Sequence, residues 1–199
     1  MRRILPLLII LTVLIIDQSI KIYIKSNWIL GEEYRIADWF IIHFTENNGM
    51  AYGIELGGSW GKLALSLFRI FAISAIGVYL YNISKTSEKP LGYIISVALV
   101  FAGAMGNILD SAFYGVFFSE SYYQIAQVMP EAGGYAGFLH GKVVDMLYFP
   151  LIEGHFPEWV PFWSNDHFIF FRPVFNIADS SISVGIAIVI LFYRSIILR

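Results

Sequence analysis

The chain has 199 residues, of which 57% are apolar and only 14% are charged. A soluble domain carries about 25% charged residues, so this composition indicates an integral membrane protein with little length for a separate soluble domain. The chain contains no cysteine, which excludes disulfides, thiol nucleophiles and thiolate metal sites. A net charge of −2, with no basic run, excludes nucleic acid as a partner.

Four apolar stretches are long enough to be transmembrane helices: residues 4–23, 63–81, 91–109 and 174–192. A helix of about 20 residues rises about 30 Å, the thickness of a hydrocarbon core. The first stretch could instead be a signal peptide, since Arg2 and Arg3 precede it. No small-residue cleavage site follows, and the apolar pattern continues through Ile20, Ile22 and Ile24, which favours a retained helix.

Basic residues predict the orientation of these helices. The two termini and the short 82–90 loop hold most of the lysines and arginines that flank the spans, so both termini are expected to be cytoplasmic. The outer segments, 25–62 and 110–173, hold all five tryptophans and nearly all the acidic residues. Tryptophan favours membrane interfaces, so we expect both segments to lie against the bilayer surface. The prediction is one mainly α membrane domain, 1–199, with four spans and a small β-rich extracytoplasmic portion.

Within the first outer segment, residues 39–46 (WFIIHFTE) are aromatic and β-branched and predict a strand, which the following NNG ends in a turn. The second outer segment has no clear period and is expected to be irregular, with one short helix. In the third span, small residues recur at four-residue spacing, which predicts close packing of another helix. These residues are Ala98, Ala102 and Gly106, with Gly103 beside them.

Two near copies, residues 107–111 (NILDS) and 176–180 (NIADS), lie at ends of apolar stretches. Each Asn-x-x-Asp places an amide and a carboxylate on one helical face. An ionisable group at the edge of the hydrocarbon is a functional-site hypothesis, and helix capping or interhelical hydrogen bonding is the competing interpretation. Together the copies indicate a carboxylate site on the outer side, where Asp179 would also gain from the positive end of its helix.

Four further charged residues stand out. Asp17 and Lys21 have the spacing of a helical salt bridge, which would anchor the end of the first span. Arg69, within the second span, is expected to snorkel or to pair with an outer carboxylate. Asp145 stands alone in an apolar octet, either as a strand residue facing water or as a carboxylate in a dry site. A dry site would raise its pKa, as an acid catalyst requires.

Other chemistries lack their motifs. The sequence contains no HExxH pattern, no Gly-x-Ser-x-Gly elbow, no P-loop and no Rossmann fingerprint, and its four histidines are scattered. Carboxylates therefore remain as the candidate catalytic groups. A small transporter would need acids near mid-span and a repeated fold, and a tetraspan scaffold would use the Asn-x-x-Asp pairs only to join helices. Both alternatives remain open at this point.

The motifs, taken together, resemble lipoprotein signal peptidase, the type II signal peptidase, an aspartyl protease of the bacterial inner membrane. The resemblance spans most of the chain and rests on five blocks in order: Asp17-Gln18-x-x-Lys21, Asn47-x-Gly49-x-Ala51-Tyr52, Gly106-Asn107-x-x-Asp110, Val143-Val144-Asp145 and Phe175-Asn176-x-Ala178-Asp179. It implies a hydrolase that cleaves a prolipoprotein on the amino side of its diacylglyceryl-modified cysteine, with the active site on the extracytoplasmic side. Its implied partners are this substrate and membrane lipid; no metal or other cofactor is implied, and we expect a monomer.

The resemblance also implies roles for individual residues. Asp145 and Asp179 become the catalytic pair, and the supporting residues are Asp17, Lys21, Asn47, Gly49, Asn107, Asp110, Asn176 and Ala178. The family usually has arginine where this chain has Ser111, and Arg172 and Lys142 are candidates to replace it. It also usually has phenylalanine where this chain has Tyr52. The stretches 111–142 and 146–173 are longer than in compact members and could form a lid, a substrate-selecting surface or a partner contact.

Overall fold

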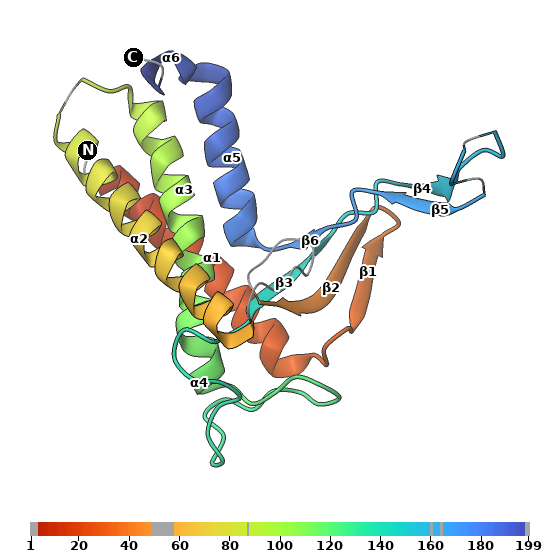
Figure 1. The fold of residues 1–199 in the computed structure, drawn as a ribbon. Helices are drawn as coiled ribbons and strands as arrows, with labels where there is room; N and C mark the ends of the chain where they lie inside the picture. The colour runs from red at the N-terminus through yellow and green to blue at the C-terminus, as the bar shows by residue number, and fades with distance from the viewer. Residues whose placement is uncertain (1–3, 49–57, 87, 160, 164, 198–199) are drawn as a thin grey trace.

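The computed structural model describes residues 4–48, 58–86, 88–159, 161–163 and 165–197. Four helices stand side by side: α1 (Ile4–Asn27), α2 (Gly58–Lys85), α3 (Leu91–Leu109) and α5 (Ile177–Phe192) (Figure 1). The start of α1, the end of α5 and the α2–α3 connection lie at one end of this bundle, here called the terminal end. A small sheet lies toward the opposite end, here called the sheet end.

Three of the helices are long and apolar enough to cross a membrane: Ile4–Asn27, Trp60–Lys85 and Leu91–Phe117. These coincide with the first three apolar stretches that were predicted to be transmembrane helices. The fourth helix is shorter than predicted, because it begins at Ile177 rather than at residue 174 and has 16 residues. Val174 and Phe175 are drawn into the sheet as β6, and Asn176 caps the helix, so α5 rises only about 24 Å.

The small residues of α3 lie where α5 crosses it. Ala98 and Ala102 are fully buried. A methyl group added to Gly103 would come within 2.2 Å of the carbonyl oxygen of Ala178, so only glycine permits this approach. The predicted packing role of the stripe is confirmed, and the close contact brings the start of α5 against the end of α3.

The end of α3 continues into one turn of π-helix, η2 (Asp110–Tyr114), and then into the short α4 (Gly115–Phe117). A π-turn carries one extra residue for each hydrogen-bonded turn and therefore changes the face on which side chains lie. Asp110 is the first residue of this turn and is fully buried.

The main sheet is antiparallel in the order β1 (Glu33–Ala37), β2 (Phe40–Asn47), β3 (Val143–Tyr148) and β6 (Val174–Phe175). The strand predicted at residues 39–46 is therefore confirmed with a shift of one residue. Inward side chains of β2 and β3 pack against the end of α1 in a core that includes Ile24, Phe44, Val144 and Met146. This core fixes the sheet to the bundle.

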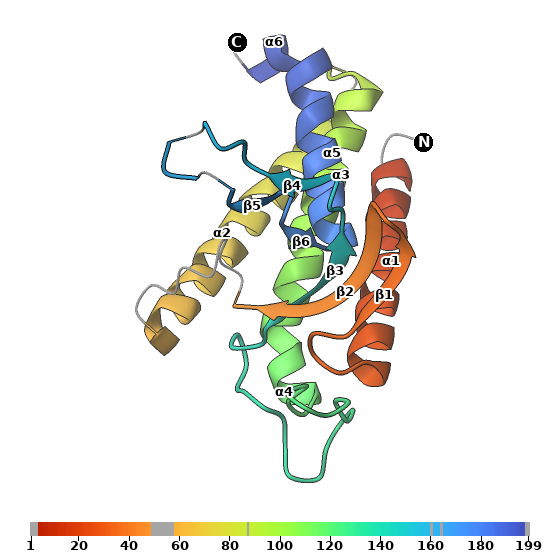
Figure 2. The same ribbon diagram turned by 90° about the vertical axis from the view of Figure 1, so that its right-hand side faces the viewer.

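The second outer segment is irregular over residues 118–142, with α4 just before it, as predicted. The hairpin that follows β3 was not predicted. β4 (Ile152–His155) and β5 (His167–Phe170) form a separate antiparallel hairpin, which extends sideways from the molecule (Figures 1 and 2). A last short helix, α6 (Arg194–Ile197), follows α5.

Candidate active site

Asp145 and Asp179 come from different elements and meet where the bundle joins the sheet. Asp145 lies on β3 and Asp179 in the first turn of α5. Asp145 is only 3% exposed, so it is a strand residue held in a dry site rather than one facing water. β3 also pairs with β6, which leads directly into α5, and this pairing brings the two aspartates together.

Asn176 holds both aspartates. Its side-chain oxygen accepts from the backbone N–H of Asp179 at 2.8 Å, and its own backbone N–H faces Oδ2 of Asp179 at 3.4 Å, which makes a reciprocal cap on α5. Its Nδ2 donates to Oδ1 of Asp145 at 2.7 Å. On the other side, Nδ2 of Asn47 donates to Oδ2 of Asp145. Each oxygen of Asp145 therefore faces an amide donor.

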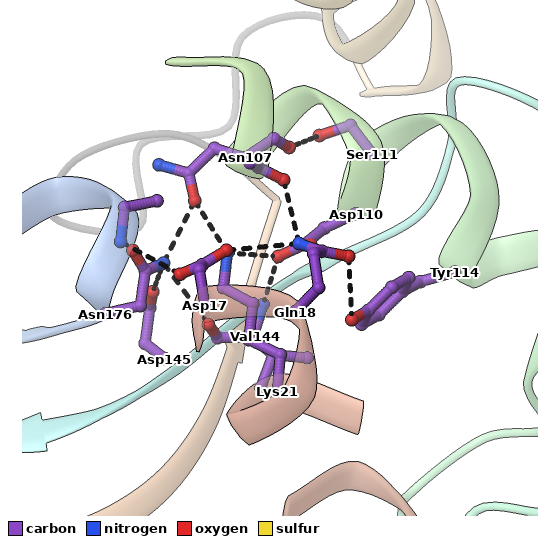
Figure 3. Close-up of polar contacts among 12 residues, drawn as sticks. Asp17, Gln18, Lys21, Asn107, Asp110, Ser111, Tyr114, Val144, Asp145 and Asn176 are labelled. Atoms are coloured by element: carbon purple, nitrogen blue, oxygen red, sulfur yellow. Dashed lines mark hydrogen bonds and ion pairs between the residues drawn. The ribbon is translucent and has the colours of Figure 1, made fainter. Parts of the chain in front are cut away.

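Asn107, from α3, completes the connection between the aspartates; Figure 3 shows its bonds to Asn176 and Lys21. Its Nδ2 donates to Oδ1 of Asp179 at 2.7 Å, and its Oδ1 accepts from Nδ2 of Asn176 at 3.0 Å. The same oxygen accepts from Nζ of Lys21 at 3.0 Å. Both Asn-x-x-Asp motifs thus contribute amides that orient carboxylates, and one of them is also a helix cap.

Lys21 is buried between two other carboxylates. Its Nζ lies 3.0 Å from Oδ2 of Asp17 and 2.8 Å from Oδ2 of Asp110, and all three side chains are at most 1% exposed. The predicted Asp17–Lys21 salt bridge is confirmed, but it lies inside the polar network rather than merely at a helix end. A buried cation offsets the cost of burying two carboxylates, and removing any one of the three groups leaves an uncompensated buried charge.

Asp17 and Asp110 tie backbone segments to this network. Oδ1 of Asp17 accepts from the backbone N–H of Ala178 at 2.9 Å, in the first turn of α5. Asp110 accepts from the backbone N–H of Val144 at 3.3 Å, one residue before Asp145. A methyl group on Gly106 would come within 2.8 Å of Oδ2 of Asp17, which explains the glycine there. These contacts fix the backbone on which each catalytic candidate stands.

The electrostatics distinguish Asp145. Burial, followed by the nearby charge of Asp179, raises the pKa of Asp145 to about 8. Lys21 and the Asn176 hydrogen bond act in the opposite direction but do not cancel these effects. A pKa of about 8 favours the protonated form of Asp145 at neutral pH.

Gln18 and Arg69 act on this network and were not predicted as site residues. Nε2 of Gln18 donates to Oδ1 of Asp110 at 2.8 Å, and its Oε1 accepts from the hydroxyl of Tyr114 at 3.2 Å. Its position beside Asp17 in the first motif was the available signal. The second residue is Arg69 of α2, whose charge interacts with Asp179 and, less strongly, with Asp145.

Lys142 and Arg172 were the candidates to replace the arginine that is usual at position 111. Neither supports the pair Asp145 and Asp179, here called the dyad. Lys142 instead pairs with Glu120 at 3.0 Å and with Glu46 at 3.6 Å, and Arg172 is exposed on the approach to β6. The hydroxyl of Ser111 donates to the carbonyl of Asn107 at 3.1 Å. Of Arg69, Lys142 and Arg172, Arg69 is the one whose charge interacts with the dyad, while Lys142 is held by its own acids. Gly49, Ala51 and Tyr52 lie outside the described residues.

Two aspartates, of which Asp145 has a raised pKa, are oriented by amides at the end of apolar helices, and this arrangement is typical of an aspartic peptidase embedded in a membrane. No three histidine, aspartate or glutamate side chains group as a metal site in the part of the chain that the structure describes.

Comparison with known proteins identifies the family. Residues 9–195 match the Signal peptidase (SPase) II family. A lipoprotein signal peptidase of Porphyromonas gingivalis is 51% identical over 185 residues, which cover 93% of this chain and 80% of that protein. A lipoprotein signal peptidase of Amoebophilus asiaticus is 34% identical over a stretch that covers 93% of this chain and 75% of that protein. A solved bacterial membrane enzyme, 26% identical, covers 94% of this chain and 90% of its own, with a TM-score of 0.59. The chain belongs to the signal peptidase II family, as its motifs predicted.

Proposed function

We propose that Asp145 and Asp179 are the catalytic pair with which this signal peptidase II removes the signal peptide of a prolipoprotein. The observation that carries the proposal is the position of Asn176, which bonds to both carboxylates through one side chain and one backbone amide. Such a clamp holds two groups at a constant relative position, as catalysis by a pair of groups requires. Both aspartates come from one chain, so a monomer suffices.

The two aspartates have different environments, which assign one the role of general acid and the other the role of general base. Asp145 carries the proton at neutral pH, so it polarises the scissile carbonyl and then protonates the departing amine. Asp179 lies in the first turn of α5, where the positive end of the helix dipole favours a carboxylate. It accepts a proton from water as the water oxygen attacks the carbonyl carbon. The C–N bond then breaks, and one molecule of water is consumed for each peptide bond cleaved.

The proposed substrate is a prolipoprotein that carries a diacylglyceryl cysteine, cut on the amino side of that cysteine. The dyad lies where the apolar helices meet the sheet, at the level where such a lipid would hold its cysteine. Tethering by the lipid would supply much of the proximity that a soluble protease obtains by binding peptide. β2 leads to Asn47, which touches Asp145, so a peptide lying along β2 would arrive at the dyad.

We further propose that α5 is a fourth span and that both termini face the cytoplasm of a bacterial inner membrane, with residues 1–199 forming one domain. The α2–α3 connection, which carries the basic residues of the 82–90 loop, lies at the terminal end. The sheet and dyad would then face the extracytoplasmic side. A 16-residue helix is short for a span, and a sheet seated partly within the interface would accommodate the mismatch.

The deciding experiment is cleavage of a diacylglyceryl-modified prolipoprotein by purified enzyme in nanodiscs. Asp145→Asn and Asp179→Asn should each abolish product formation while leaving insertion and helix content unchanged. Asp38→Asn is the matched control, since that side chain is 98% exposed in a surface pair, and it should retain full activity. Processing at the normal rate by either dyad variant would refute the assignment.

A further inference from the structure

Residues 151–172, here called the arm, leave the main sheet after β3 and return to it at β6. Within the arm, β4 and β5 pair from Ile152↔Phe170 to His155↔His167. Figures 1 and 2 show the arm extending sideways, level with α5, rather than beyond the sheet end of the bundle. It leaves the bundle beside the start of α5 and does not project into the water beyond the sheet end.

The surface of the arm is aromatic, most of all at its tip. Trp159 is 81% exposed, Phe162 95% and Trp163 58%. Inside the arm, the ring of Phe156 packs on those of Phe168 and Trp163, with centroids 4.8 and 6.2 Å apart. A two-stranded hairpin is at best marginally stable in water. A hairpin with so many exposed aromatic side chains is therefore expected to be stable only where an apolar environment covers them.

We propose that the arm is an interfacial anchor, with its aromatic tip in the headgroup region of the leaflet in which α5 begins. Tryptophan and phenylalanine favour this layer, because it accepts an apolar ring and leaves polar groups hydrated. The arm has three acids, Glu153, Glu158 and Asp166, against one arginine, Arg172. Anionic lipid would repel such an arm, so apolar insertion into zwitterionic lipid is its mode of attachment.

The anchor has a structural consequence for the dyad. The register pair Tyr148↔Val174 closes the base of the arm. Asp145 lies three residues before this pair and Asn176 two residues after it. The depth of the arm therefore sets the height of β3, and of the start of α5, relative to the lipid surface. This consequence for cleavage rests on the proposed function, whereas the anchoring does not.

The test uses the full chain in phosphatidylcholine nanodiscs. In one variant Trp163 is the only tryptophan, and the other four are replaced by phenylalanine. A matched control carries all five replacements together with Tyr123→Trp. Tyr123 is 82% exposed, and its 118–142 segment projects beyond the sheet end of the bundle (Figure 1). Quenching is measured with brominated phosphatidylcholine from the lipid side and with iodide from the water side.

We expect brominated lipid to remove about half or more of the Trp163 fluorescence and iodide to have little effect, with the reverse at position 123. Exposure of Trp163 to iodide would overturn the proposal while leaving the activity assignment intact. Shielding of Trp163 only after prolipoprotein is added would also overturn it, because the arm would then bind substrate. These readouts apply equally to the inactive Asp145→Asn chain.

A second measurement addresses the height of the dyad. Combining Trp159→Ser with Phe162→Ser should lower kcat/KM several-fold for a prolipoprotein in phosphatidylcholine nanodiscs. Tyr122→Ser, at an exposed position outside the arm, should leave it unchanged. Unchanged kcat/KM in the double variant, with its tip released into water, would overturn the depth-setting role.

Discussion

Asn107 and Asn176 are hydrogen-bonded to each other at 3.0 Å, and each donates its side-chain amide to a different aspartate. The path from Asp179 to Asp145 therefore runs through two amides on two helix ends. This arrangement holds two carboxyl groups near one another without requiring either to bond to the other. It also makes the geometry of the pair sensitive to either amide.

Asn176→Ala should lower kcat about 100-fold, because Asp145 loses an orienting donor and shifts from its position. The free energy of unfolding should fall by about 1 kcal/mol or more, since α5 also loses its cap. Ser180→Ala is the control, because its hydroxyl bonds only to the Asn176 carbonyl among the described contacts. Equal losses in both variants would indicate a general weakening of α5. Kinetics and thermal unfolding in detergent give the two readouts.

The pH dependence of kcat/KM should show an alkaline limb near pH 8. The pKa of Asp145 is raised to about 8, first by burial and then by the charge of Asp179. Asp145 therefore keeps its proton below this pH and loses it above, and activity is lost with the proton. A profile that stays flat to pH 10 would contradict an acid role for Asp145.

Stability should respond to the same titration. An unfolded aspartate ionises near pH 4, whereas Asp145 in the folded chain ionises near 8, so the unfolded state binds fewer protons between these values. The contribution of Asp145 is then fully present below pH 4 and is lost as the pH rises to 8, by about 1.4 kcal/mol per pH unit. Asp145→Asn should remove this slope. Thermal midpoints of both proteins, measured across pH 4–8, provide the comparison.

Lys21→Met should destabilise the protein by about 3–5 kcal/mol, because it leaves Asp17 and Asp110 buried without their shared cation. Adding Asp110→Asn should recover part of the loss, as contacting residues are not additive. The exposed pair Arg35–Asp38 offers a matched control, and Arg35→Met should cost less than about 1 kcal/mol. Equal effects at the two sites would mean that the buried network contributes no more than a surface pair.

Arg69→Gln should move the alkaline limb of kcat/KM to higher pH, because a cation that acts on Asp145 is removed and its proton is held more tightly. Arg69→Lys should keep the limb close to its original pH. A purely structural role for Arg69 would lower kcat in both variants without moving the limb. The measurement is the pH profile of all three enzymes under one set of conditions.

Local patterns in the sequence predicted much of this arrangement. The length of continuous apolar stretches located three long helices, and small residues at four-residue spacing marked the face on which another helix packs, because both patterns are properties of neighbouring residues. The hairpin of β4 and β5 was not predicted. Each of its strands has only four residues and β4 contains Gly154, and the aromatic residues that would reveal the hairpin serve equally well in an irregular interfacial segment.

The roles of the charged residues were harder to predict, and Asp145 shows why. Its octet allowed either a strand residue facing water or a carboxylate in a dry site, and the structure has it buried on β3, which pairs with β2 and β6. Lys142 was a candidate for the dyad and pairs elsewhere, while Arg69 reaches the dyad from another helix. The partner of a charged side chain depends on which helices and strands pack against each other. A local sequence pattern does not contain that information.

Composition and motif order were sufficient to place this chain in a membrane and in the signal peptidase II family, because both depend on residue types along the chain. The twin Asn-x-x-Asp motifs located the site but suggested Asp110 and Asp179 as equals. Tertiary structure separated them: Asp110 turns to Lys21 and the backbone of β3, while Asp145 shares Asn176 with Asp179. Contacts such as that of Asp17 with Ala178, 161 residues apart, exist only once the helices have packed.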